Sequence, residues 1–208
     1  MLVPLNKGII GAESARLLGS LIVGLSWMLA LSRAKQSPDA RCLVSIFIDE
    51  LQSYLALPTD LAEALSQARG LGVGFTLAHQ YRAQLNPAIR AAIDANARNK
   101  VVFNLNAADA KDMAAMAPEL ETVDFMSLER YQIYTSLQSD GRGTGWVSGK
   151  TSPAPIPLRL PVELKARSMH RYGQNPAEVE NDSTNASLTL SNAEPFAPTA
   201  NIGRKKIA

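Results

Sequence analysis

Apolar runs alternate with helical patterns along the first part of the chain. The apolar runs are short, rich in β-branched residues and bounded by turn residues, which predicts strands at 2–6, 42–48, 73–78 and 100–105. Apolar residues at helical spacing predict helices at 13–34, 59–69, 87–97 and 107–117, with Thr59 as a cap of the second. Strands that are apolar on both faces are typical of a covered parallel sheet. The pattern therefore predicts an α/β fold with a parallel sheet between two helical layers.

The pattern changes toward the end of the chain. Segments 131–137 and 145–147 predict a closing hairpin around Asp140-Gly141. Four prolines between 153 and 161 interrupt regular structure, and 162–171 predicts a short helix. From 181 onward Asn, Ser, Thr, Ala and Pro dominate. We therefore expect an α/β domain over 1–150, a proline-rich extension over 151–180 and a disordered tail over 181–208.

The long helical pattern at 13–34 carries no charge between Arg16 and Arg33. A membrane helix or the core of a signal peptide could look similar. A membrane span needs roughly 20 apolar residues, whereas this run is shorter and contains several Gly and Ser residues. Leu17, Leu21 and Leu25 fall on one helical face. We expect a helix buried in the α/β core and no membrane span.

Charge and cysteine content narrow the class of protein. The formal net charge is +2, so no strong overall field indicates a nucleic acid or a membrane. The single cysteine, Cys42, excludes a disulfide framework and makes a cysteine-based zinc site untenable. A reducing, cytoplasmic location follows as an expectation.

Candidate chemistry gathers where two predicted strands end. Asp49 and Glu50 follow the most hydrophobic strand, and ligands bind at the carboxyl ends of strands in open α/β sheets. Such a pair suits Mg²⁺-assisted phosphoryl transfer, in which Asp49 holds the metal with Glu50 nearby and Glu50 polarises the attacking water. The alternative is an acidic helix start. Gln80 follows the next strand and would stand beside Glu50 if the two strands are neighbours.

Two arginines are further candidates for functional residues, whereas a pair of aspartates and a histidine have structural interpretations. Arg69 ends the helix between those strands, where it either caps the helix dipole or projects as an arginine finger into a neighbouring subunit. Arg98 precedes the strand at Lys100 and either contacts nucleotide or DNA or is a solvated helix end. Asp109 and Asp112 read as a solvated helix face, and His79 as a residue that packs on the other side of its strand.

Three segments resemble a known family of motors. They are NKGIIGAESARLLGSL (6–21), FIDELQSYLALPTDLAEALSQARGLGVGFTLAHQ (47–80) and NARNKVVFNLNAADA (96–110). They are similar to the conjugative coupling-protein branch of the HerA and FtsK-like P-loop ATPases. The resemblance implies a RecA-like fold, a hexameric ring around DNA, and ATP and Mg²⁺ as cofactors. It further implies a Walker B pair in Asp49 and Glu50, a trans-acting finger in Arg69 and a sensor in Gln80.

The phosphate-binding loop of that family is missing from its expected place. Ser148-Gly149-Lys150-Thr151 imitates its end, but Thr144 replaces the first glycine and prolines follow where a helix must begin. We therefore expect the carboxy-terminal half of a DNA-translocating ATPase of conjugation or type IV secretion, inactive without an upstream half. Its implied partners are DNA, copies of itself and relaxosome or secretion-channel proteins, through which it could associate with a membrane. The alternative is a non-enzymatic scaffold derived from such an ATPase.

Overall fold

The computed structural model describes residues 1–54, 61–139, 141–175, 179 and 181. The chain divides into two compact units, Met1–Ser152 and Pro153–Ala208, which are described separately. The first unit contains the helices α1 (Lys7–Ile10), α2 (Ala12–Ser32), α3 (Leu61–Gln67), α4 (Pro87–Asn96), α5 (Ala107–Ala114) and α6 (Thr122–Met126). Its strands are β1 (Val44–Ile48), β2 (Val73–Leu77), β3 (Lys100–Val102), β4 (Gln132–Ser139) and β5 (Arg142–Lys150). Short 3₁₀ turns are η1 (Arg33–Lys35), η2 (Pro38–Ala40), η3 (Leu51–Tyr54), η4 (Ala68–Leu71) and η5 (Arg82–Gln84).

Strands β1 and β2 form a parallel pair, with Val44 opposite Val73 and Ile48 opposite Leu77. The chain passes from β1 to β2 through α3, as a parallel connection requires. Apolar side chains of this pair pack on α2, α3 and α4 in a first core cluster. Its buried members are Trp27, Ala30, Ile48, Leu51, Ala64, Ala68, Leu71, Val73 and Leu85.

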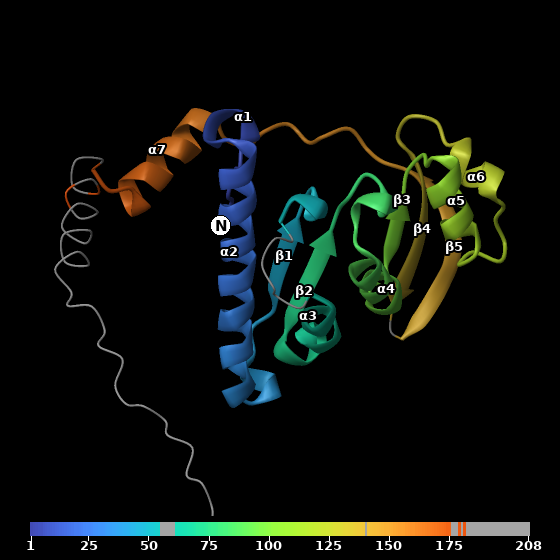
Figure 1. Ribbon diagram of the computed structural model, residues 1–208, viewed down its shortest axis with the longest axis horizontal. Coiled ribbons are helices and arrows are strands. Elements are labelled where there is room, and N and C mark those ends of the chain that lie inside the picture. Colours follow the sequence, from blue (N-terminus) through green and yellow to red (C-terminus); the bar gives the residue numbers. More distant parts are fainter. Residues whose placement is uncertain (55–60, 140, 176–178, 180, 182–208) are drawn as a thin grey trace, which may run out of the picture. The chain divides into compact units, whose positions relative to one another are not determined.

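Strands β3, β4 and β5 form a separate antiparallel sheet in that order. Helices α5 and α6 pack against it around Phe125, which is fully buried. The other buried members of this second core cluster are Val102, Ala110, Met113 and Ala117. The described residues of the first unit therefore form two sheets (Figure 1). Each sheet has its own hydrophobic core.

The expected single three-layer parallel sheet is not what the described residues form. The predicted hairpin is present as β4 and β5, but the strand at 100–105 is only Lys100–Val102 and pairs antiparallel with β4. Side chains fix this pairing, because Thr135 Oγ1 donates to the Lys100 carbonyl at 3.0 Å and Asn99 Oδ1 accepts from the Gln138 N–H at 2.7 Å. The predicted strand at 2–6 is irregular, because a strand requires a neighbour and none of the described strands pairs with it.

Helix α2 is less buried than expected. Trp27 and Ala30 lie in the first core cluster, whereas Leu25, Met28 and Leu29 are 57–70% exposed. By length and apolar composition, Ala12–Lys35 is one helix among the described residues that could cross a membrane. The packing of Trp27 against Phe75, with ring centroids 6.3 Å apart, shows that one face of this helix belongs to the protein core.

The second unit contains α7 (Pro161–Tyr172), which matches the short helix expected at 162–171. Proline at its first position fits a helix start, since that N–H has no intrahelical partner. The predicted cap Thr59 and the predicted disordered tail at 181–208, Asn181 apart, lie outside the described residues.

Candidate functional site

Two strand ends meet at the carboxyl edge of the parallel pair. The Ala78 N–H donates to the Ile48 carbonyl and the Leu51 N–H donates to the Ala78 carbonyl, both at 2.9 Å. This ladder holds the turn after β1 beside the turn after β2. As the strand order predicted, Gln80 reaches Glu50: its Nε2 donates to Glu50 Oε1 at 2.8 Å.

Glu50 is held on several sides. Its second carboxylate oxygen, Oε2, accepts from Gln52 Nε2 at 2.6 Å. Its backbone has φ of +52°, a left-handed conformation that side-chain-bearing residues rarely adopt and that costs on the order of 1 kcal/mol or more. Backbone strain of this kind clusters at functional sites. The geometry fixes one acid at the sheet edge with an amide donor against it.

Asp49 is suited to a hydrated cation. Its side chain is exposed, and its Oδ1 accepts from the Glu50 N–H at 2.9 Å. Among the described residues no group of three His, Cys, Asp or Glu side chains could enclose a metal. Mg²⁺ does not need such a cage, because it keeps several waters and uses one or two carboxylates together with substrate phosphates. Asp49, with Glu50 next to it, therefore fits Mg²⁺ and not a metal held by protein alone.

The structure does not bring the two predicted arginines to this edge. Arg69 is exposed in η4, just before the amino end of β2, whereas Gln80 follows its carboxyl end. A five-residue strand separates them, about 15 Å. Arg98 is exposed between α4 and β3, after α4 has carried the chain back from the Gln80 turn. At this separation Arg69 cannot share a site with Glu50 of the same chain.

A phosphate-binding loop is absent from the described residues. Gly149 and Lys150 lie in β5, opposite Ile133 and Gln132 of β4. Their backbone is part of an antiparallel ladder, so it cannot form the amide cradle of a strand–loop–helix motif. This agrees with the sequence interpretation of Ser148–Thr151 as an imitation of the motif.

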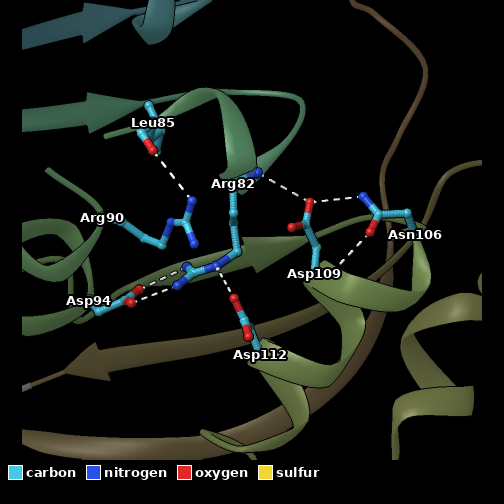
Figure 2. Close-up of polar contacts among 7 residues, drawn as sticks. All are labelled: Arg82, Leu85, Arg90, Asp94, Asn106, Asp109 and Asp112. Carbon is cyan, nitrogen blue, oxygen red and sulfur yellow. Dashed lines mark hydrogen bonds and ion pairs between the residues drawn. The ribbon is translucent and has the colours of Figure 1, made fainter. Parts of the chain in front are cut away.

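A partly buried ionic cluster next to the site was missed by sequence reasoning. The Arg82 guanidinium donates to both carboxylate oxygens of Asp94 at 2.9 and 2.7 Å and to Asp112 at 3.1 Å (Figure 2). The Arg82 backbone N–H donates to Asp109 Oδ2 at 3.2 Å, and Asn106 Nδ2 donates to the same oxygen at 3.0 Å. We call these four charged residues, Arg82, Asp94, Asp109 and Asp112, the Arg82 cluster.

The expectation that Asp109 lies on a solvated helix face is therefore wrong. Asp109 is only 4% exposed, because it sits in the first turn of α5 and faces the backbone of η5. Asp112 does remain partly exposed, at 46% of its side chain. Sequence periodicity could not have found the cluster, since its partners lie 12, 27 and 30 residues from Arg82.

Charge and burial shift the pKa values of the titratable groups in and around the cluster. Hydrogen bonds from the Arg82 guanidinium lower the pKa of Asp94 below its usual 3.8, and the same bonds raise the pKa of Arg82. Burial, followed by the nearby Arg82 charge, lowers the pKa of His79 below 6.5. Burial also lowers the pKa of Lys100. His79 is half-buried just beyond the end of β2, and its lowered pKa leaves it neutral at neutral pH.

Comparison with known proteins supports the fold. No protein-family model and no curated protein matches the chain. Two solved structures of the plasmid coupling protein TrwB do match, each with a TM-score of 0.57. One is the complex with the GTP analogue GDPNP, at 18% sequence identity, and the other is the complex with the ATP analogue ADPNP, at 19%. A structure described as the bacterial conjugative coupling protein TrwBdeltaN70, unbound, matches with a TM-score of 0.56.

The chain has the fold of part of a conjugative coupling protein. The first two matches cover 72% of this chain and 40% of the TrwB chain, so the chain spans less than half the length of TrwB. A further TrwB structure, with ADP and Mg²⁺, matches over the same shares. The match to TrwB confirms the resemblance of the chain to conjugative coupling proteins.

Proposed function

We propose that this chain supplies the acidic pair and the sensor of a nucleotide-driven, DNA-translocating motor of conjugation or type IV secretion. The observation that supports this proposal most directly is the Glu50–Gln80 hydrogen bond at the carboxyl edge of a parallel strand pair in a TrwB-like fold. TrwB itself has been solved with ADP and Mg²⁺, which supports the same pair of cofactors here.

Each residue at the edge has a role in this proposal. Mg²⁺, when bound, neutralises charge that develops on transferring phosphates. Asp49 holds that cation directly or through its waters. Glu50 accepts a hydrogen bond from the attacking water and orients it, and it is the group that takes the proton. Gln80 donates to Glu50 and so keeps its Oε1 in place without changing the charge of the site.

Other parts of the motor must come from outside the described residues. A strand–GxxxxGK[ST]–helix segment, in a longer chain or on a partner, would supply the phosphate cradle. Arg69 lies about 15 Å from the Glu50 edge along β2 and is exposed, which supports an action on the site of a neighbouring subunit in a ring. Arg98, also exposed, would contact nucleotide or DNA across such an interface.

The assembly is proposed to act in the cytoplasm on DNA, and relaxosome or secretion-channel proteins would bring it to the membrane. A hexameric ring is the form that the family resemblance implies. In a closed ring with head-to-tail interfaces, one face of each subunit meets a different face of its neighbour. Such an interface would allow Arg69 of one subunit to act at the Glu50 site of the next.

The test is hydrolysis by a reconstituted complex. The chain is combined with a coupling-protein fragment that carries the strand–GxxxxGK[ST]–helix segment, and ATP turnover with Mg²⁺ is measured with and without DNA. Glu50→Gln keeps the size of the side chain and one oxygen that can accept from Gln80, but it removes the base and the oxygen that accepts from Gln52, so turnover should fall by roughly 100-fold or more. Glu129→Gln, an exposed acid before β4, is the matched control and should have no effect.

Two results would count against the proposal. One is a complex that assembles but has no Mg²⁺-dependent turnover. The other is turnover that Glu50→Gln leaves unchanged. Either result favours the alternative, a scaffold that keeps the fold without the chemistry. That alternative has one observation in its favour, the lack of a phosphate cradle among the described residues.

A further inference from the structure

Gln80 lies in a short span between two fixed points. On one side, Ala78 is bonded through its N–H and its carbonyl to the backbone after β1, at 2.9 Å in both directions. On the other side, Arg82 begins η5 and is 8% exposed, with its backbone N–H bonded to Asp109. Three residues, 79 to 81, connect the two points, and Tyr81 is extended. The position of the Gln80 amide therefore depends on both anchors.

The second anchor, Arg82, is held by residues from both cores. Arg82 is held by Asp94 of α4 and by Asp109 and Asp112 of α5, as Figure 2 shows. Helix α4 packs on the first core cluster through Ile89 and Ile93, whereas α5 belongs to the second. The Arg82 cluster is thus a polar link between the two cores, and it is attached two residues from Gln80.

The hydrogen bonds at Arg82 are strong and directional. The pair with Asp94 is bidentate, and charge-assisted contacts of this kind are about twice as strong as neutral ones. Burial keeps the guanidinium in this arrangement, because leaving a buried charge without its carboxylate partner has a large free-energy cost. By contrast, Gln80 is itself exposed, so its position depends on the two anchors on either side of it.

We propose that Arg82 is a positioning residue, which holds Gln80 against Glu50 and ties this edge of the parallel pair to α5 and the antiparallel sheet. The inference rests on the proposed function for its catalytic consequence, but its geometric part stands alone. A shift of the α5 side would move the Gln80 amide, and Glu50 would lose its donor. The cluster would then connect nucleotide chemistry to movement of the second core.

The first experiment is a double-mutant cycle in the reconstituted complex. Arg82→Met should lower kcat by roughly tenfold or more and leave KM for ATP within about twofold, because binding groups are untouched while the amide is misplaced. In a Gln80→Ala background the same substitution should change kcat by less than about twofold. Arg142→Met, an exposed arginine of β5, is the matched control. An equal loss of kcat in both backgrounds, or none in either, would overturn the proposal.

The second experiment uses the 208-residue chain alone, so it does not depend on hydrolysis. The side-chain NH₂ resonances of Gln80 are followed by ¹H–¹⁵N NMR, with Glu50→Ala as the reference for an unbonded amide. Arg82→Met should move these resonances to the Glu50→Ala position while the Trp146 indole signal stays. Unchanged Gln80 resonances in a folded Arg82→Met chain would refute the positioning role.

A gentler substitution covers the case in which Arg82→Met unfolds the chain. Asp112→Asn removes one charge from a partly exposed partner, so the fold should persist while the Gln80 resonances shift in the same direction by a smaller amount. Unshifted resonances in Asp112→Asn, together with an unfolded Arg82→Met, would assign the cluster to stability alone. Failure of the proposed function looks different: the wild-type complex would not hydrolyse ATP, whereas the NMR result would still stand.

Discussion

Phe125 offers the sharpest test of the second core. Its side chain is fully buried in α6, and its ring meets Tyr134 and Trp146 edge-on, with centroids 5.4 and 5.5 Å apart. The Leu105 N–H donates to its carbonyl at 3.0 Å, which ties α6 to the end of β3. Removing this ring should leave a cavity lined by two aromatic edges.

The expected loss can be worked from this burial. Phe→Ala in a core costs about 3–5 kcal/mol, and two lost edge-to-face pairs place Phe125→Ala near the upper end, about 5 kcal/mol. Phe125→Leu retains much of the volume and should cost about 1.5 kcal/mol. Val123, on the same helix but 59% exposed, provides the control, because Val123→Ala should cost about 0.5 kcal/mol or less.

The assay uses the two tryptophans of the chain as separate reporters. Trp27 lies in the first core and Trp146 packs against the second. Urea unfolding is followed by fluorescence in Trp27→Phe and Trp146→Phe backgrounds, so each variant reports from one core. Because the Arg82 cluster links the cores, Phe125→Ala should lower the midpoint seen by Trp27 as well as that seen by Trp146.

Three results would refute this reasoning. A cost below about 1 kcal/mol for Phe125→Ala would mean that the ring is not packed as described. A cost for Val123→Ala equal to that of Phe125→Leu would mean that burial does not set the order. An unchanged Trp27 midpoint would mean that the two cores unfold independently and that the polar link does not couple them.

Further predictions concern pH, a helix cap and the ring. The folded pKa of His79 lies below 6.5, so as pH falls the unfolded chain binds a proton at His79 before the folded chain does. The melting temperature should therefore fall as pH drops from about 7.5 to 5.5, and His79→Gln should reduce this pH dependence. A steeper fall in the variant would contradict this prediction. Asn86 Oδ1 accepts from the Ile89 N–H at 2.8 Å, so Asn86→Ala should cost about 1 kcal/mol in urea unfolding, and no loss would exclude the cap. If Arg69 acts in trans, mixing inactive Glu50→Gln and Arg69→Ala subunits should restore activity at about one quarter of the interfaces, whereas no recovery would place both residues in one subunit's site.

Much of the Glu50 edge could be predicted from the sequence. A continuous apolar run that ends in Asp49-Glu50 and a second that ends near Gln80 imply neighbouring parallel strands when one helix separates them. Strand and helix periodicity are local properties, so they survive in a short window of sequence. Their consequence, Glu50 beside Gln80, needs only the rule that parallel neighbours end at the same edge.

Other features depended on contacts that sequence patterns do not encode. Lys100–Val102 looks like any short apolar strand, and its direction in a sheet was decided by the edge that β4 presents to it. The expected strand at 2–6 had the right composition but no neighbour among the described strands, and a strand without a neighbour leaves its backbone groups unpaired.

The sequence by itself determined where β1 and β2 end and where the acidic pair follows, because local periodicity and chain connectivity are enough to place them. The tertiary structure alone decided which charges are buried. Asp109 and Arg82 are charged residues of the kind that usually face solvent, yet the packing of α4 and α5 around η5 buries both. The Arg82 guanidinium then pairs with Asp94 and Asp112, and Asp109 accepts from the Arg82 backbone N–H. Burial of a charge is settled by partners distant in the chain, since the cost of desolvation is met only where opposite charges converge in space.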